Sequence, residues 1–156
     1  MVNPSQIFLE EKDIVMHIAV LMRIAMADGR FLDSEKMFLE SVASSYTKAY
    51  GTRSFDNMVD DVITNLPVSA IDVWLKATSD RPSQARLLIK DMIALGYVDN
   101  DFCKAEREVV DKYAELLNVP KEIVDVFDKC ISILVKATNE LHEVLEISQV
   151  QRKGAR

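Results

Sequence analysis

The stretch IAMADGRFLDSE, residues 24–35, decides the fold because its skeleton returns later in the chain as LGYVDNDFCKAE, residues 95–106. The two stretches differ at most positions, yet an acid, an aromatic ring and a second acid recur in the same order and at the same spacing. A constant offset superposes three identical pairs: Asp28 with Asp99, Phe31 with Phe102, and Glu35 with Glu106.

The segments around the repeated stretch also match when residues 14–47 are placed on residues 85–118 without a gap. Apolar residues then fall on apolar residues on both sides, as in the pairs Ile18 with Ile89, Ile24 with Leu95, and Leu39 with Val110. This pattern predicts a helical hairpin that is present twice. Two such hairpins can bury their apolar faces against each other as pseudo-symmetric halves.

The remainder of the chain favours helices as well, because only four Gly and four Pro among 156 residues leave little material for a β-rich fold. Apolar spacing and capping residues predict an all-α fold, a single compact bundle of about seven helices. The expected helices cover approximately residues 9–27, 33–50, 54–66, 71–78, 82–98, 103–117 and 120–147.

The chain length, the net charge and the length of the apolar runs limit the number of domains and the kinds of partner that we expect. A chain of 156 residues predicts one domain, which we place at residues 1–148, followed by a disordered basic tail at 149–156. The net charge of −6 argues against a nucleic-acid partner, since phosphate binding needs clustered Lys and Arg. The most apolar run, residues 14–27, is too short to span a bilayer. We expect a cytoplasmic protein.

Each repeated stretch is expected to form the corner between two helices. Gly29 and Asn100 occupy equivalent positions, and these residue types accept a positive φ most readily. The side chains of Phe31 and Phe102 can then pack into the core and fix the position of the corner. The glutamates lie in the first turn of the following helix, where backbone amides and the positive end of the helix dipole face them.

The acids at these corners, Asp28, Glu35, Asp99 and Glu106, allow two interpretations. They can satisfy backbone amides at the helix ends, in which case no ligand is required. Alternatively, the clustered oxygens can hold a hard divalent metal ion whose shell is completed by water. The spacing does not match a calcium-binding EF-hand loop, because the twelfth position counted from Asp28 or Asp99 is Leu39 or Val110.

The phrase IAMADGRFLDSEKMFLESVA, residues 24–43, resembles the signature of the tellurite-resistance TerB family, which includes the N-terminal domain of the DnaJ-like protein DjlA. The resemblance covers roughly residues 10–120. It implies a compact helical bundle with an acidic metal site, which by motif match falls on Asp28, Glu35, Asp99 and Glu106. It also implies a stress-response context with protein partners. Asn100 and Val98 depart from the family pattern in the second copy.

The sequence offers no set of catalytic residues, and we therefore expect a binding module rather than an enzyme. His17 lies on the apolar first helix, too far from Asp28 to share its site, and is interpreted as a core or groove histidine. Cys103 and Cys130 are expected to be small buried side chains. The alternative function is a metal-free protein scaffold or homodimer that uses the long seventh helix as its interface.

Overall fold

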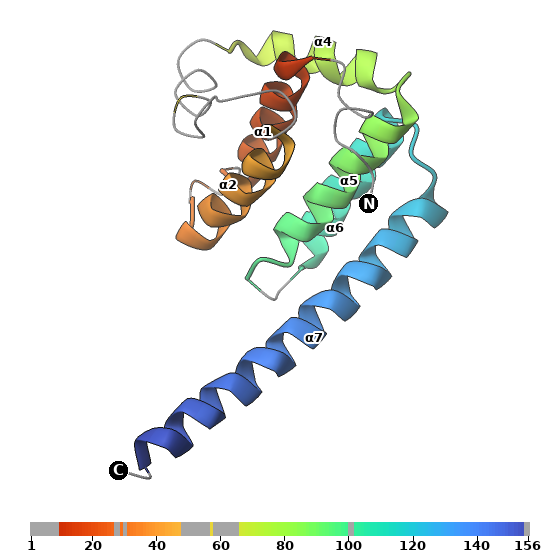
Figure 1. Ribbon diagram of the computed structural model, residues 1–156. Helices are drawn as coiled ribbons and strands as arrows, with labels where there is room; N and C mark the ends of the chain where they lie inside the picture. Colours follow the sequence, from red (N-terminus) through yellow and green to blue (C-terminus); the bar gives the residue numbers. More distant parts are fainter. Residues whose placement is uncertain are drawn as a thin grey trace.

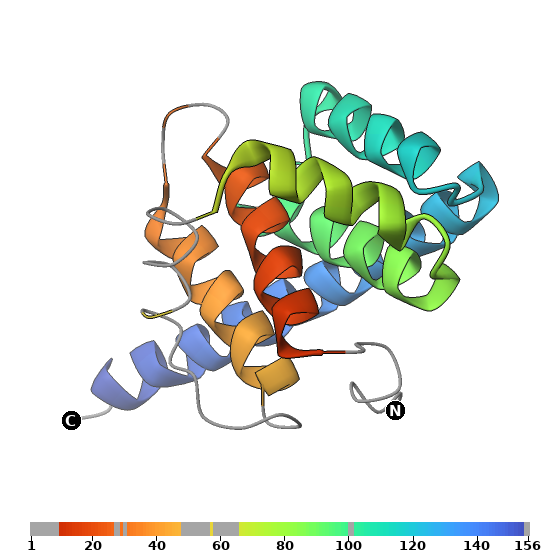
Figure 2. The same cartoon turned by 90° about the horizontal axis from the view of Figure 1, so that it is seen from above.

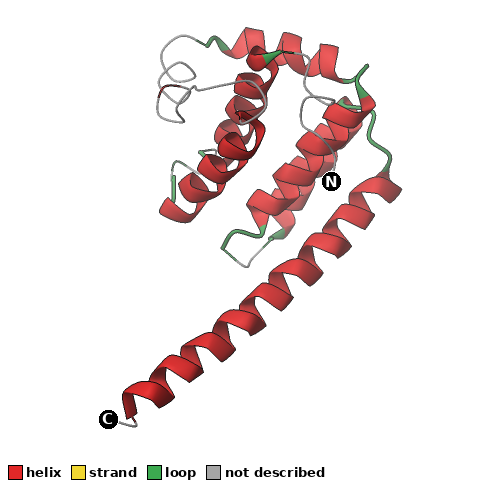
Figure 3. Cartoon of the chain, viewed as in Figure 1, coloured by secondary structure: helices red, strands yellow, loops and turns green. Residues whose placement is uncertain are grey.

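The computed structural model of the chain describes residues 10–26, 29, 31–47, 57, 66–99 and 102–154. The longer described segments contain six helices and no strand, which confirms the all-α prediction (Figure 3). The short helix expected at residues 54–66 lies outside the described residues apart from Asn57, so the predicted number of seven helices is not confirmed.

Two helical hairpins form the body of the molecule. Helix α1 (Glu11–Ala25) packs against α2 (Asp33–Thr47), and α5 (Pro82–Gly96) packs against α6 (Lys104–Leu116). Helices α1 and α5 contact each other and so join the two hairpins, while α4 (Val68–Thr78) lies across one end of both (Figures 1 and 2). The origin of the hairpins from one duplicated unit remains a prediction.

The core lies where α1 and α5 meet. Both helices carry apolar side chains around most of their circumference, as a helix packed on several sides requires. The fully buried side chains include Ile14, Ile18 and Leu21 from α1, and Leu88, Ile89 and Ile93 from α5. These two central helices fix the corners that follow them, because each corner begins where one of them ends.

The first corner has the backbone that the sequence predicts. Gly29 has φ of +78°, the left-handed region that a residue without a Cβ enters at no steric cost. Phe31 is partly buried against the core, and its counterpart Phe102 is buried. Asn100 lies outside the described residues.

Helix α7 (Lys121–Gly154) is the longest element and runs past the ends of α5 and α6 (Figure 1). Its first half packs on these two helices through Val124, which is buried, and through the partly buried Phe127 and Ile131. The sequence predicted an end near Ile147, but no helix-breaking residue precedes Gly154 and each added residue completes a further backbone hydrogen bond. The tail boundary predicted at residue 149 therefore falls inside a continuous helix.

Candidate functional site

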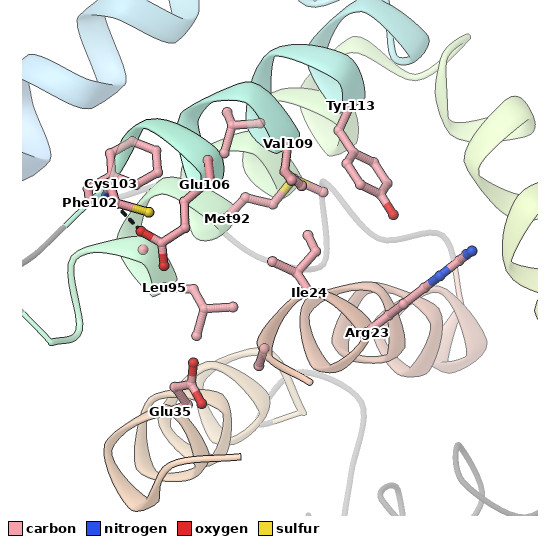
Figure 4. A pocket seen from close by; sticks show the side chains of 14 residues that line it. Arg23, Ile24, Glu35, Met92, Leu95, Phe102, Cys103, Glu106, Val109 and Tyr113 are labelled. Carbon is pink, nitrogen blue, oxygen red and sulfur yellow. Dashed lines mark hydrogen bonds between the residues drawn. The ribbon is translucent and has the colours of Figure 1, made fainter. Parts of the chain in front are cut away.

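A cavity of about 480 Å³ opens between the two hairpins. It is lined by residues from the end of α1, the first turn of α2, the end of α5, the segment just before α6, and α6 as far as Tyr113 (Figure 4). Most of the wall is apolar and includes Ile24, Met92, Leu95, Val109 and Val110. The cavity therefore lies beside the ends of α1 and α5, the helices that precede the two predicted corners.

Two of the four predicted site residues, Glu35 and Glu106, line this cavity from different hairpins. Glu35 belongs to α2 and Glu106 to α6, and both are partly buried. Figure 4 shows the two carboxylates approaching the cavity from opposite sides, with Leu95 between them. The fold thus brings together two acids that are far apart in the sequence.

Each glutamate accepts a hydrogen bond from a backbone amide at the start of its own helix. The backbone N–H of Leu32 donates to Glu35 Oε2 over 2.8 Å, and the backbone N–H of Cys103 donates to Glu106 Oε2 over 2.8 Å. In both cases the glutamate is three residues after the donor, which is the spacing of a capping box. Each of these two acids therefore satisfies a backbone amide at the start of its helix. An ionised carboxylate has about four lone-pair positions, so a capping bond uses only part of its capacity to accept.

Phe102 fixes the position of the second corner. A Cβ placed on Gly96 would lie only 2.5 Å from the Phe102 ring, so the ring packs where α5 has no side chain. The Arg107 guanidinium lies 4.4 Å from the centre of the same ring, and its Nε donates to the Phe102 carbonyl oxygen over 3.2 Å. These contacts set the start of α6 and hence the direction of Glu106.

Helix α7 is attached beside this corner by a polar cluster. Asp128 accepts hydrogen bonds from the Tyr97 hydroxyl, over 2.6 Å, and from the Arg107 guanidinium. Burial and the bond to Asp128 raise the pKa of Tyr97, and the bond to Asp128 raises the pKa of Arg107. Arg107 thus links the corner that carries Glu106 to the long helix.

The remaining two predicted site residues are not brought into the cavity by the described structure. Asp99 is exposed in the turn after α5 and does not line the cavity, and Asp28 lies outside the described residues. Within the part of the chain that the structure describes, no three His, Cys, Asp or Glu side chains come together as a metal-binding group. Among described residues, the acidic site is thus a pair of glutamates.

A second group of polar side chains, which sequence reasoning missed, is buried between α1, α2 and α5. His17 Nε2 lies 2.8 Å from Asp91 Oδ2, and the Tyr46 hydroxyl donates to the same oxygen over 2.6 Å. Lys90 Nζ lies 2.8 Å from Asp91 Oδ1. Burial alone would raise the pKa of Asp91, but the hydrogen bond and charge of His17, together with Lys90, lower it. Burial and the neighbouring Asp91 raise the pKa of Tyr46.

A third polar group joins the start of α1 to α4 and α5. Asp13 Oδ1 accepts from Trp74 Nε1 over 2.9 Å and from the Arg81 guanidinium over 3.1 Å. Burial opposes ionisation of Asp13, yet these partners and the backbone N–H of Glu10 lower its pKa overall. In the sequence, Asp13 directly precedes the apolar run of α1. A carboxylate at such a position is expected to be buried, and a buried charge needs hydrogen-bonding or ionic partners.

Two other sequence predictions have clear outcomes. His17 is fully buried, which confirms its interpretation as a core histidine. The expectation for the cysteines was wrong, because Cys103 and Cys130 are both exposed. Cys103 precedes α6 at the corner, and Cys130 lies on the side of α7 that the bundle does not cover, so neither reaches the core.

The helices in the described part of the chain include none that combines the length and the apolar character needed to cross a membrane. No protein-family model matches the chain, and no match was found among curated proteins or among solved structures. The features that bear on function are therefore the cavity and the residues that line it.

Proposed function

We propose that the protein is a non-catalytic helical binding module in which a divalent metal ion, held between Glu35 and Glu106, links the two hairpins. The observation that carries this proposal is that both glutamates line one cavity although they belong to different hairpins. Their equivalent positions in the repeated stretch give each the same capping bond and direct both toward the space between the hairpins.

Electrostatics supports an ion between these side chains. The two carboxylates and the Arg23 side chain line a cavity whose other walls are largely apolar, where repulsion between like charges is screened less than in water. A divalent cation offsets this repulsion and provides attraction to both hairpins. Carboxylate oxygens are the ligands that Ca²⁺ and Mg²⁺ prefer, which makes a hard cation the best match to this donor set.

The residues that would hold the ion are Glu35 and Glu106, and water would complete its shell. When bound, the ion would supply charge neutralisation and a bridge between the corners. Capping fixes the glutamates before an ion arrives, and this preorganisation lowers the cost of binding. A bound ion would in turn stabilise the folded chain, since it binds the native state alone.

The cellular context of the proposal comes from the resemblance to the TerB family. On that basis the module acts through protein partners in a stress response of the tellurite-resistance type, in the cytoplasm. The acidic corners and the ion between them would then form the surface that a partner recognises. The resemblance is the source of this context, and the cavity is the source of the proposed ion site.

A second function is favoured by a different observation. Both glutamates already have a structural task, because each caps the helix on which it lies. If capping is their whole role, the protein is a metal-free scaffold or dimerisation module. Glu→Gln variants separate the two functions, since glutamine also satisfies a capping box but carries no charge.

The experiment is calorimetric titration of the full chain with Ca²⁺, Mg²⁺, Mn²⁺ and Zn²⁺. The double variant Glu35→Gln with Glu106→Gln should lose the binding heat of at least one of these ions. The matched control is Glu40→Gln with Glu115→Gln, because these glutamates are exposed on α2 and α6 and lie outside the cavity. Equal heats for the wild type and the cavity variant would remove the metal role and leave the scaffold.

A further inference from the structure

Helix α7 has an apolar stripe that the bundle does not cover. We define this stripe by five side chains that are each more than half exposed, from 52% for Leu145 to 65% for Leu134. The stripe consists of Val126, Ile133, Leu134, Leu141 and Leu145. At 100° per residue these positions share one face of the helix.

The stripe lies beside the face that packs on the bundle and continues it along α7, since at 100° per residue Leu134 and Leu145 lie within about 20° of Phe127. Val124, Phe127 and Ile131 form that packed face, and they contribute to the core with α5 and α6. Helix α7 therefore has a broad apolar surface, of which the fold covers only the part near Val124, Phe127 and Ile131. A soluble monomer seldom leaves a long continuous apolar surface in water, and such an uncovered surface is typical of a helix with a partner.

Between residues 129 and 143, the charged residues beside the stripe are separated by sign along the helix. Lys129 and Lys136 precede Ala137, and Glu140 and Glu143 follow it. All four are exposed, and the helical period places them on the same side of the stripe. Among the described residues, none of the four has an ion-pair partner within the chain. The sign of the charge changes near Ala137.

We propose that a second copy of this chain covers the stripe, with the two α7 helices antiparallel and a two-fold axis near Ala137. Antiparallel packing brings the same side of both helices together. It therefore places the basic part of one helix beside the acidic part of the other. A parallel pair in register would instead place Lys at the level of Lys and Glu at the level of Glu.

The order of the charges is what selects a second copy over an unrelated protein. A two-fold interface requires a surface that is complementary to itself, so that a residue before the axis meets a residue after it. Across an axis near Ala137, Lys129 of one helix can meet Glu143 of the other and Lys136 can meet Glu140, which satisfies this requirement. Ala137 itself is small and exposed, which allows the two helices to approach closely at the axis.

This inference concerns a surface other than the proposed metal site and does not depend on it. No residue of the stripe lines the cavity that contains Glu35 and Glu106. Either proposal can therefore be contradicted by experiment without affecting the other. The variant Glu35→Gln with Glu106→Gln should remain dimeric, and a variant of the stripe should keep the metal-binding heats of the wild type.

Sedimentation equilibrium of the full chain tests the dimer. The wild type should show twice the chain mass of 17.7 kDa. The variant Leu134→Lys with Leu141→Lys should raise the dimer dissociation constant by at least roughly a hundredfold, because it removes two apolar contacts and adds like charges at the interface. The control Met37→Lys with Val73→Lys, at exposed apolar side chains on α2 and α4, should remain dimeric.

Disulfide cross-linking tests the orientation, with Cys103→Ser present in every variant. In the antiparallel pair the two Cys130 residues lie on opposite sides of the axis, roughly 20 Å apart, so they cannot form a disulfide. Oxidation should instead cross-link the variant that carries Ala137→Cys and Cys130→Ser. A monomeric wild type, a dimer that survives Leu134→Lys with Leu141→Lys, or a disulfide through Cys130 would overturn the proposal.

Discussion

His17 on α1 and Asp91 on α5 form the polar contact at the centre of the fold, with 2.8 Å between Nε2 and Oδ2. His17 is fully buried and Asp91 is 2% exposed. Tyr46 on α2 donates to the same carboxylate oxygen, so one side chain joins three helices. Because α1 and α5 lead into the corners before Glu35 on α2 and Glu106 on α6, this contact and the apolar core around it set how the two hairpins face each other.

Removal of the Asp91 carboxylate should destabilise the whole molecule. Asp91→Ala leaves His17 and the Tyr46 hydroxyl buried without their shared acceptor, and loss of one member of a buried charged group costs about 3–5 kcal/mol. Urea unfolding measures this change in the free energy of unfolding. The exposed Asp80 provides the control, and Asp80→Ala should change stability by less than about 0.5 kcal/mol. Equal stability of the two variants would contradict the role of Asp91.

Stability should fall in acid because of Asp13 and Asp91. Both carboxyl groups have pKa values below the ordinary value of 3.8, owing to their hydrogen bonds and nearby cations. The unfolded chain therefore binds protons at a higher pH than the folded chain does. The stabilisation is complete above 3.8 and is lost as the pH falls through the lower pKa values of the folded state.

Urea unfolding between about pH 6 and about pH 2.5 measures this dependence. The double variant Asp13→Asn with Asp91→Asn should be less stable near neutral pH and should lose less stability on acidification. Asp80→Asn, at an exposed carboxylate, should follow the wild-type curve. A double variant with the wild-type slope would show that other groups cause the acid sensitivity.

The contact between Gly96 and Phe102 predicts that Gly96→Ala destabilises the protein, although the same substitution usually stabilises a helix. In an unconstrained helix, Ala is more favourable than Gly by about 1 kcal/mol. Here a Cβ would lie 2.5 Å from the Phe102 ring, so Gly96→Ala should instead destabilise the protein by about 1–3 kcal/mol. The change in the free energy of unfolding is the measurement.

A double-mutant cycle with Phe102→Leu provides the control for Gly96→Ala. The smaller side chain makes room for the Cβ, so the cost of Gly96→Ala should be lower in the Phe102→Leu background. Stabilisation by Gly96→Ala in the wild-type background would mean that the ring does not occupy this position. The second corner would then lack the packing that directs Glu106.

Local features of the site were predictable from the sequence. The corner at Gly29 and the capping bonds of Glu35 and Glu106 depend on neighbouring residues, and the repeated stretch displays them twice. The burial of Phe102 followed from the same pattern. Such features are readable because glycine conformation and helix capping involve contacts over a few residues.

Features that depend on contacts between residues far apart in the sequence were not predictable from the sequence alone. The meeting of His17, Tyr46 and Asp91 depends on the packing of three helices, and the spacing of these residues shows no repeat. The exposure of Cys130 depends on which face of α7 packs on the bundle. A helix whose apolar residues spread over much of its circumference does not indicate which part of that surface the fold buries.

The most direct test of the shared ion site is a crystal soaked in Mn²⁺ or Ca²⁺ and measured by anomalous diffraction. The account predicts one anomalous peak in the cavity, within bonding distance of carboxylate oxygens from both Glu35 and Glu106. Crystals of the Glu35→Gln, Glu106→Gln variant should lack that peak. A wild-type cavity without an anomalous peak, or a peak bound by only one of the two glutamates, would contradict an ion that links the hairpins.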